Sequence, residues 1–220
     1  MFGTLDQMLA DLVDLVLPRH CYGCGRAGAG LCGTCAPIAL VAVDCAGLPV
    51  IAAGRYEGPL RDAVLAYKER GRRDLARPLA ALLGAAVAAL DVPNALLVPI
   101  PSAASARRAR GGDHVLRLSR RVGPSTPAVR LTRAVQDSAG LGANARAANL
   151  AGAFSARPPR CRGAYAVVVD DIVTTGATLA EATRALTHAG WHTAGGAVVA
   201  ATPLRSTAKP PRVARRRGPV

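Results

Sequence analysis

The chain has 220 residues, half of them hydrophobic and only 3% aromatic, so it can hold one ordinary domain and a small appendage around a core of Ala, Val and Leu. No apolar run reaches the roughly 18 residues of a membrane span, which argues against a membrane-spanning protein. The formal net charge of +14 is compatible with a nucleic-acid partner or an anionic substrate. However, only Lys68 and Lys209 of the 28 basic residues are lysines, so the charge also reflects a bias toward arginine.

The chain begins with the segment MFGTLDQMLADLVDLVLP, which predicts an amphipathic helix. Asp6, Asp11 and Asp14 interrupt its apolar residues, and a basic leader is missing, so the segment does not resemble a secretion signal. We therefore expect a cytoplasmic protein.

Two Cys-x-x-Cys pairs follow this segment, formed by Cys21 with Cys24 and by Cys32 with Cys35. Each pair turns through small residues, so four thiolates can surround one ion in the closed tetrahedral shell of a structural zinc site. Disulfides are the alternative, although a cytosolic chain disfavours them. Cys45 and Cys161 lie outside the pattern and are expected to be ordinary thiols.

A strand is predicted from about Leu48, followed by a long helical run from Pro59 to Leu90. Within that run, Lys68 lies in a basic cluster with Arg70, Arg72 and Arg73. A solvated helix end would explain such charges. Lys68 is nevertheless the only lysine outside the C-terminal tail, which suggests that a compact ammonium group is needed for chemistry, such as a substrate contact.

The next predicted strand, Ala95 to Ser102, leads into a loop of small residues that carries Arg107, Arg108 and Arg110. A loop of this kind after a parallel strand can bind a diphosphate, because guanidinium groups pair with phosphate oxygens. A solvent-exposed basic turn is the alternative. A short helix (HVLRLSRRV) and a strand (AVRLTRA) are expected next.

The polar stretch from Val135 to Leu150 lacks a clear period and is predicted to be a long loop. Such a loop could close over a bound substrate. A short strand, AGAF, is expected after it.

The most informative segment is VVVDDIVTTGATL, from Val167 to Leu179. A buried strand, Ala166 to Val169, is followed by Asp170 and Asp171 and then by a loop of small residues that opens a helix to His188. The loop residues are Thr174, Thr175, Gly176, Ala177 and Thr178. Backbone N–H groups and hydroxyls at a helix N-terminus bind phosphate, whereas the carboxylates suit ribose hydroxyls or Mg²⁺. A 5-phosphoribose satisfies both halves; a structural strand and turn is the alternative.

Gly190 is predicted to cap that helix, and HTAGGAVVAATPL supplies a last strand. Alternating strands and helices predict an α/β fold with a parallel sheet, helices on both faces and ligands at the carboxyl ends of the strands.

The Asp-Asp and Thr-Thr-Gly-Ala-Thr segment resembles the 5-phosphoribosyl-1-diphosphate (PRPP) motif of type I phosphoribosyltransferases. Over nearly its full length the chain resembles the ComF family, in which a four-cysteine zinc finger precedes a phosphoribosyltransferase-like domain. The other matching residues are Tyr56 to Leu60, Tyr67, Lys68, Gly71, Val98 to Pro101, Arg110, Gly111, Gln136, Arg146, Asn149 and Phe154. The family's usual Arg-Gly-Phe-Asn-Gln is Arg110-Gly-Gly-Asp-His in this chain, so Asp113 or His114 would have to replace the amide side chains.

The resemblance divides the chain into a zinc finger with its preceding helix (1–47), a phosphoribosyltransferase-like domain (48–204) and a basic tail (205–220). It implies that Asp170 and Asp171 hold ribose hydroxyls or metal, that residues 174–178 hold the 5-phosphate, and that Mg²⁺ accompanies PRPP. Possible diphosphate or substrate contacts are Lys68, Arg107, Arg108, Arg110, Gln136, Arg146 and Asn149. No residue stands out as a general base.

Family members are linked to natural competence, where they help to move incoming single-stranded DNA inside the cell. The resemblance therefore implies a PRPP-binding protein, with or without transferase activity, that acts in DNA uptake and contacts single-stranded DNA or the uptake machinery. A nucleotide-salvage phosphoribosyltransferase and a non-catalytic module for nucleotides or single-stranded DNA are the alternatives. The basic tail could contact nucleic acid nonspecifically or simply be solvated.

Overall fold

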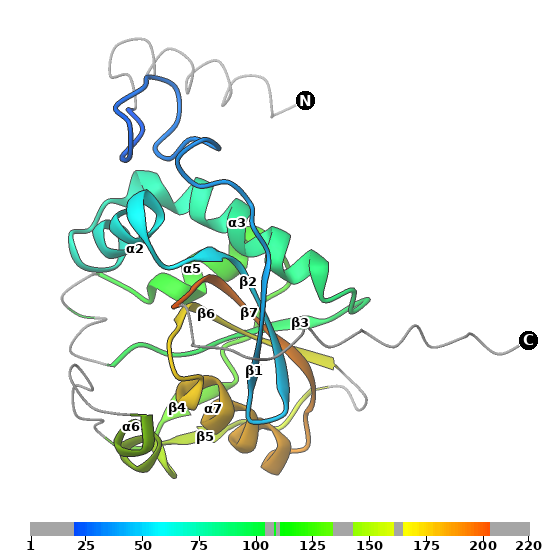
Figure 1. Ribbon diagram of the computed structural model, residues 1–220. Coiled ribbons are helices and arrows are strands. Elements are labelled where there is room, and N and C mark those ends of the chain that lie inside the picture. Colours follow the sequence, from blue (N-terminus) through cyan, green and yellow to red (C-terminus); the bar gives the residue numbers. More distant parts are fainter. Residues whose placement is uncertain (1–19, 104–107, 109–110, 134–142, 161–164, 203–220) are drawn as a thin grey trace, which may run out of the picture.

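The protein is an α/β structure built on a mostly parallel five-stranded sheet (Figure 1). The computed structural model describes residues 20–103, 108, 111–133, 143–160 and 165–202, without the side chains of 143, 144 and 146. In sheet order the strands are β1 (Val41–Cys45), β2 (Leu48–Arg55), β7 (His192–Ala201), β6 (Tyr165–Val173) and β3 (Leu96–Pro99). The last four run parallel, and β1 pairs antiparallel with β2. The predicted N-terminal helix and basic tail lie outside the described residues.

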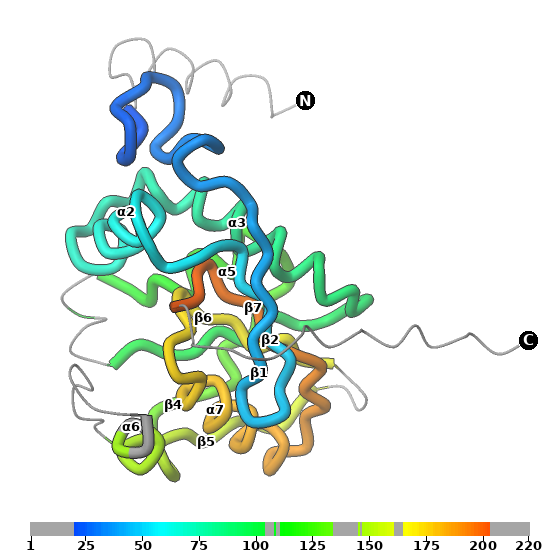
Figure 2. The backbone as a smooth tube through the Cα atoms, in the orientation of Figure 1, coloured from blue at the N-terminus to red at the C-terminus, as the bar shows by residue number. Residues whose placement is uncertain are grey.

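Helices cover both faces of the sheet, as predicted (Figures 1 and 2). The helices are α2 (Gly58–Glu69), the short 3-10 helix η1 (Arg73–Leu75), α3 (Ala76–Ala89), α5 (His114–Val122), α6 (Ala143–Leu150) and α7 (Ala177–His188). Helices α2, α3 and α5 pack on one face, and α7 packs on the other. A separate antiparallel pair, β4 (Val129–Leu131) and β5 (Phe154–Ala156), packs beside α7.

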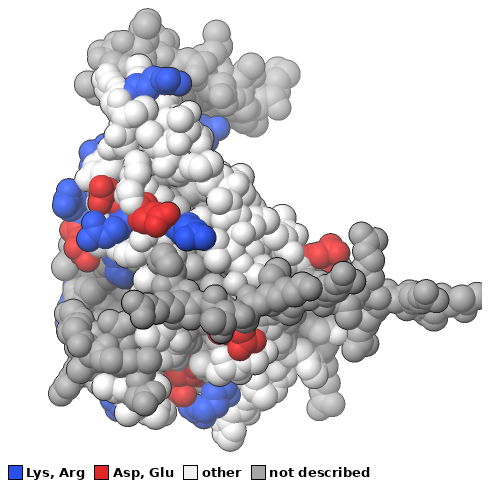
Figure 3. Space-filling view, in the orientation of Figure 1, with Lys and Arg blue, Asp and Glu red and all other residues white. Residues whose placement is uncertain are grey.

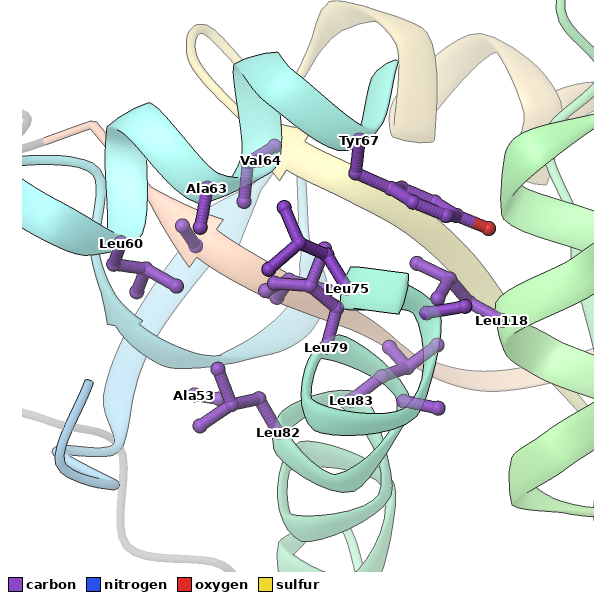
Figure 4. Close-up of a cluster of buried hydrophobic side chains, with 14 of the residues drawn as sticks. Ala53, Leu60, Ala63, Val64, Tyr67, Leu75, Leu79, Leu82, Leu83 and Leu118 are labelled. Carbon is purple, nitrogen blue, oxygen red and sulfur yellow. The ribbon is translucent and has the colours of Figure 1, made fainter. Parts of the chain in front are cut away.

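The strand β6 separates two hydrophobic cores. Val167 and Val169 belong to the core under α2, α3 and α5, whereas Ala166 and Val168 belong to the core under α7. This division follows from the period of two residues by which side chains alternate across a strand. Figure 4 shows the first core, in which leucines of η1, α3 and α5 meet the buried face of α2. The absence of large aromatic residues from most of this packing agrees with the composition.

The predicted helical run from Pro59 to Leu90 is interrupted after Glu69, so it forms α2, η1 and α3. Gly71 has a φ of 67°, a left-handed conformation that a glycine adopts without steric cost. The N–H groups of Arg70 and Arg72 both donate to the carbonyl of Ala66, which closes the end of α2. The chain then turns and restarts as η1.

Three further segments differ in detail from the sequence prediction. The strand β1 was not predicted, and it starts the sheet at Val41, ahead of the predicted domain boundary at residue 48. The end of the predicted loop 135–150 is the helix α6, whereas residues 134–142 lie outside the described part. Strand β6 continues through both aspartates to Val173 instead of ending before them. Across the described ranges, no helix is long and apolar enough to cross a bilayer.

Candidate functional site

The carboxyl ends of β3, β6 and β7 meet at one edge of the sheet, where the loop 174–176 leads from β6 into α7. Gly176 is the N-cap residue of α7 and has a φ of 76°. A Cβ atom at this position would lie 2.4 Å from the Sγ atom of Cys45, so a glycine is required by both conformation and space. The first N–H groups of α7 have no intrahelical acceptor and face this edge, which is the arrangement that binds a phosphate.

The two adjacent aspartates lie on opposite faces of β6. The alternation from Ala166 to Val169 places Asp170 on the α7 face and Asp171 on the α2 and α5 face. Asp170 is half-buried and Asp171 is buried. The aspartate pair therefore provides one carboxylate to each side of the sheet edge.

Asp171 is the acceptor in a cluster of protein donors. Its Oδ2 atom lies 3.0 Å from Nζ of Lys68 and 2.8 Å from Nε2 of His114, and its Oδ1 atom accepts from the N–H of Ile172. Burial alone would raise the pKa of Asp171. The hydrogen bond from His114 and the charge of Lys68 outweigh it and hold that pKa well below the usual range. Asp171 is thus ionised, and both of its oxygens are engaged by protein donors.

Asp170 has a different environment, because its Oδ1 atom accepts only a hydrogen bond from the N–H of Asp171 among the bonds found in the described part of the chain. Burial, and then the neighbouring charge of Asp171, raise the pKa of Asp170 well above its usual value. A further hydrogen bond, donated by a ligand, would stabilise the ionised form of this carboxylate. Asp170 is therefore the member of the pair that is suited to bind a ligand hydroxyl.

His114 connects the aspartate to the end of β3. Its Nδ1 atom lies 3.0 Å from Oγ of Ser102, and its carbonyl accepts from the hydroxyl of Tyr67. Asp113 caps α5 by accepting from the N–H groups at the start of the helix, and its other oxygen accepts from the N–H of Ser102. In Figure 4 the Tyr67 side chain extends from α2 toward α5. Three elements thus hold the ring of His114 in one orientation.

The sequence analysis placed no role on Ser102 and treated His114 only as a replacement for a family glutamine. The available signal was the position of Ser102 at the carboxyl end of a predicted strand and of His114 at the start of the helix predicted after it. The contact between His114 and Asp171 was not predictable, because the two residues are 57 positions apart in the sequence. The pairing of β3 with β6 brings their segments together.

A cavity of about 290 Å³ opens beside Ser102 at the same edge of the sheet. Ser102 and Asp113 form one side of it. The side chains of Arg130 and Arg157, which are both exposed, lie on another side. The cavity therefore adjoins the Ser102, His114 and Asp171 chain and is accessible to solutes.

The structure describes only some of the other residues that were predicted to contact the diphosphate or the substrate. Lys68 does reach the sheet edge, but its ammonium group lies against Asp171. Arg108 is exposed, and the backbone carbonyl of Asn149 accepts from Arg133. Arg107, Arg110 and Gln136 lie outside the described residues, as does the side chain of Arg146. A substrate-contact role for these residues stays a prediction.

The four cysteines predicted to bind zinc do come together. Their Sγ atoms all lie within 4.8 Å of one another, and those of Cys24 and Cys32 are 3.7 Å apart. Four sulfurs at about 2.3 Å from a zinc ion would be about 3.8 Å apart in a tetrahedron. The N–H of Cys32 also donates to the sulfur of Cys21. Although burial raises the pKa of Cys21, backbone N–H groups of its neighbours lower it to about 6, which favours the thiolate. The cluster could hold a metal ion such as zinc.

The cysteine cluster is fixed to the rest of the protein through Tyr22. Arg70 donates to its hydroxyl at 2.9 Å, and the guanidinium of Arg72 lies 5.4 Å from its ring centroid. Arg72 is itself held by a two-point contact with Asp74. The end of α2, which carries Lys68, is therefore linked to the first cysteine pair.

A scan against models of protein families and a comparison with curated proteins found no match to this chain.

Proposed function

We propose that this chain is a ComF-like, PRPP-binding protein of the phosphoribosyltransferase type that acts in DNA uptake. One observation carries the binding part of the proposal: the half-buried carboxylate of Asp170 lies on the strand that leads into the glycine-capped N-terminus of α7. The assignment to DNA uptake rests on the resemblance of the sequence alone.

In the proposed complex, the N–H groups of the first turn of α7 bind the 5-phosphate, together with the hydroxyls of Thr174, Thr175 and Thr178. Asp170 accepts from the ribose hydroxyls. The diphosphate, which carries its Mg²⁺ as part of the substrate, extends toward the arginine-rich segment after β3, where Arg108 is exposed. Asp171 acts from within the protein by holding Lys68 and His114.

The reaction that fits this arrangement is displacement of diphosphate from the anomeric carbon of the ribose by an acceptor nucleophile. The protein contributes orientation of the two reactants and stabilisation of the charge on the leaving diphosphate. This chemistry requires no covalent intermediate with the protein.

Calorimetric titration of the reduced, zinc-loaded protein with PRPP and Mg²⁺ tests the binding proposal. We expect saturable binding that falls at least tenfold in Asp170→Asn, because the amide replaces one carboxylate oxygen with an NH₂ group that cannot accept from a ribose hydroxyl. Asp62→Asn is the matched control, since Asp62 is exposed and pairs with its neighbour Arg61. Equal binding by the wild type and Asp170→Asn, or no binding by the wild type, would overturn the proposal.

A second candidate, a module that binds single-stranded nucleic acid, is favoured by one other feature. An open groove of about 880 Å³ lies between α3 and α5. Three arginines, Arg73, Arg77 and Arg121, line it together with small alanines and one carboxylate, Asp74. Arginines along a groove can follow a phosphate backbone. On the face shown in Figure 3, by contrast, basic side chains lie beside acidic ones over the region of α2.

This candidate predicts that Arg77→Ala with Arg121→Ala weakens binding of an oligodeoxythymidylate and reduces the salt dependence of its affinity. If the double variant binds the oligonucleotide as the wild type does, the groove is not its site. If the wild type binds DNA and leaves PRPP unaltered, the non-catalytic module is the better description.

A further inference from the structure

The structure supplies an acceptor for the proton that the proposed reaction must remove. An N–H or O–H nucleophile loses a proton when it displaces diphosphate, and the sequence alone indicated no base. His114 is buried, with about 6% of its surface exposed, and both of its ring nitrogens have defined partners. It lies between an ionised carboxylate and a serine that opens onto a cavity.

The partners of His114 define the direction of proton transfer. A carboxylate can only accept, so Nε2 of His114 carries the hydrogen that faces Asp171. In the neutral ring, Nδ1 is then the acceptor, and the hydroxyl of Ser102 donates to it at 3.0 Å. The oxygen of Ser102 keeps lone pairs that can accept from a molecule in the cavity.

We propose that Ser102 and His114 form a proton relay that deprotonates the acceptor nucleophile, which binds in the cavity of about 290 Å³ beside Ser102. Ser102 contacts the acceptor and is the catalytic residue of the relay. His114 acts through Ser102. The relay rests on the proposed function, because it needs PRPP as the second reactant.

The step balances without a further reactant. The acceptor forms a bond to the anomeric carbon while the bond from that carbon to the diphosphate oxygen breaks, and its electron pair leaves with the diphosphate. The proton of the acceptor passes to Oγ of Ser102 as the serine proton passes to Nδ1 of His114. The imidazolium is then stabilised by Asp171, the carboxylate 2.8 Å away.

The charges around His114 are arranged for this exchange. Lys68 of α2 contacts the same carboxylate oxygen and limits how strongly Asp171 attracts the proton. The ring of Tyr67 meets the imidazole edge to face with centroids 6.3 Å apart. Asp113 is directed to the N-terminus of α5 and to the backbone of Ser102. These are the charged and titratable groups of α2, β6 and α5 found to face the ring within the described ranges.

The cavity also limits the class of acceptor. Its volume is at the lower end of the range for small-molecule sites, so it suits a single ring or a smaller molecule. Arg130, which also donates to the hydroxyl of Ser155, and Arg157 line the cavity and favour an acceptor that carries a carboxylate or a similar anionic group. We therefore assign the cavity to a small anionic acceptor with an ionisable N–H or O–H group.

The test compares the wild type with His114→Gln, Ser102→Ala and Ser102→Thr, each zinc-loaded. PRPP binding is measured by calorimetry, and diphosphate release is measured from pH 5 to pH 9 with orotate, uracil and hypoxanthine as acceptors, each of which carries an ionisable N–H group. Glutamine still donates to Asp171 but cannot take a proton, so His114→Gln should keep PRPP affinity within about threefold. Its diphosphate release should fall at least about 100-fold, the effect typical of a lost general base.

The pH profile separates a relay from a structural role. In the wild type, the rate should fall on the acid side as the relay becomes protonated, and this limb should disappear in His114→Gln. Ser102→Ala should lose activity, and Ser102→Thr should restore most of it by returning the hydroxyl. Ser125→Ala is the matched control, since the Ser125 hydroxyl donates to the carbonyl of Gly123, away from His114.

Each outcome supports or overturns the relay. A His114→Gln variant with the wild-type rate and pH profile overturns the relay and leaves the proposed function intact. The relay is also overturned if the wild type binds PRPP but releases no diphosphate with any acceptor of the panel. If the wild type does not bind PRPP, the proposed function fails, and the relay fails with it.

Discussion

The ammonium group of Lys68 lies 3.0 Å from the Oδ2 atom of Asp171 and so joins the last turn of α2 to the end of β6. About 33% of the Lys68 side chain is exposed, against 6% of the Asp171 side chain. The pair therefore connects a solvated helix end to a buried carboxylate. His114 contacts the same oxygen and also bonds to Ser102. We therefore expect a substitution of Lys68 to alter the hydrogen bonds of His114 and Ser102 as well.

Lys68→Met should destabilise the protein by about 1–3 kcal/mol. Removal of one partner leaves a buried charge less well compensated, which costs about 3–5 kcal/mol for a fully buried pair, and partial exposure of the lysine reduces that cost. Urea unfolding at pH 7 measures the difference. Arg61→Met is the control, because the exposed pair of Arg61 with Asp62 should contribute less than about 1 kcal/mol. Equal effects of the two substitutions would show that the contact of Lys68 with Asp171 is not stabilising.

Acid should destabilise the protein partly through Asp171. Its pKa in the folded state is held below the unfolded value of about 3.9, so its ionised form stabilises the fold fully above about pH 5. That contribution is lost as the pH falls through 3.9 toward the folded value. The unfolding free energy of the wild type should therefore decrease more steeply between about pH 5 and pH 3 than that of Asp171→Asn. Parallel curves for the two proteins would contradict the depressed pKa.

Asp170→Asn should have the opposite effect on stability. Burial and the charge of Asp171 raise the pKa of Asp170, so its neutral form is favoured and the stability that this form contributes is lost as the pH rises through the folded pKa. The amide retains the oxygen that accepts from the N–H of Asp171. We expect an unfolding free energy about 0.5–2 kcal/mol higher at pH 7, with a smaller gain near pH 4.

The same substitution should weaken PRPP binding at least tenfold, so Asp170 would contribute to binding at a cost in stability. Thermal and urea unfolding of the same samples used for calorimetry would measure both effects. If Asp170→Asn is less stable than the wild type at pH 7, the carboxylate of Asp170 makes stabilising contacts beyond the hydrogen bond from the N–H of Asp171.

The elements near the site were predictable where a short segment carries its own signal. The apolar run of β6 and the glycine at residue 176 follow from local sequence, and the structure confirms them. The end of α7 was also predictable, although the C-cap residue is Ala189 and the predicted Gly190 follows it with a φ of 89°. The cysteine pairs were predictable for the same reason, since their spacing determines which thiols can meet. Gly71 was noted within a basic cluster, but its helix-ending role depends on a φ of 67° that the helical pattern around it did not indicate.

The relation between the two aspartates was not predictable from their adjacency. The apolar pattern predicts a strand that ends at Val169, with both carboxylates directly after it and ahead of the loop. Because β6 continues through both aspartates, Asp171 lies on the face of Val167 and Val169, toward α2 and α5. Its partners, Lys68 and His114, come from distant segments, and only the packing of both helices on one face of the sheet brings them together.

Zinc removal should loosen the end of α2 before it unfolds the sheet. Reduced protein should contain one zinc ion per chain, and Cys24→Ser should lower that content, whereas Cys45→Ser should not, because Cys45 packs against Gly176 away from the cluster. A chelator should speed cleavage by trypsin after Arg70 and Arg72, since both contact Tyr22 beside the first cysteine pair. Metal-free protein that retains the wild-type cleavage rate would show that the fold around Tyr22 does not depend on metal.

Gly176→Ala should be one of the most damaging single-atom additions in the chain, because it combines a conformational and a steric cost. A left-handed φ costs an alanine about 1–2 kcal/mol, and the contact of the new Cβ with Cys45 adds about 1–3 kcal/mol. Gly190→Ala is the matched control: its φ is 89°, but a Cβ atom there would have no neighbour within 4 Å, so only the conformational cost applies.

A double-mutant cycle separates the two costs of Gly176→Ala. In a Cys45→Ala background the sulfur is absent, but the Cβ atom of residue 45 still lies 2.8 Å from the new Cβ, so the destabilisation should fall only part of the way toward that of Gly190→Ala, with a coupling of about 0.5–3 kcal/mol measured by urea unfolding. Because the N–H groups of α7 would shift with the loop, Gly176→Ala should also lose PRPP affinity in both backgrounds, whereas Gly190→Ala should not. Equal destabilisation with and without the sulfur of Cys45 would mean that the loop 174–176 moves away from the sulfur, and the Sγ atom of Cys45 would then have no role in shaping that loop.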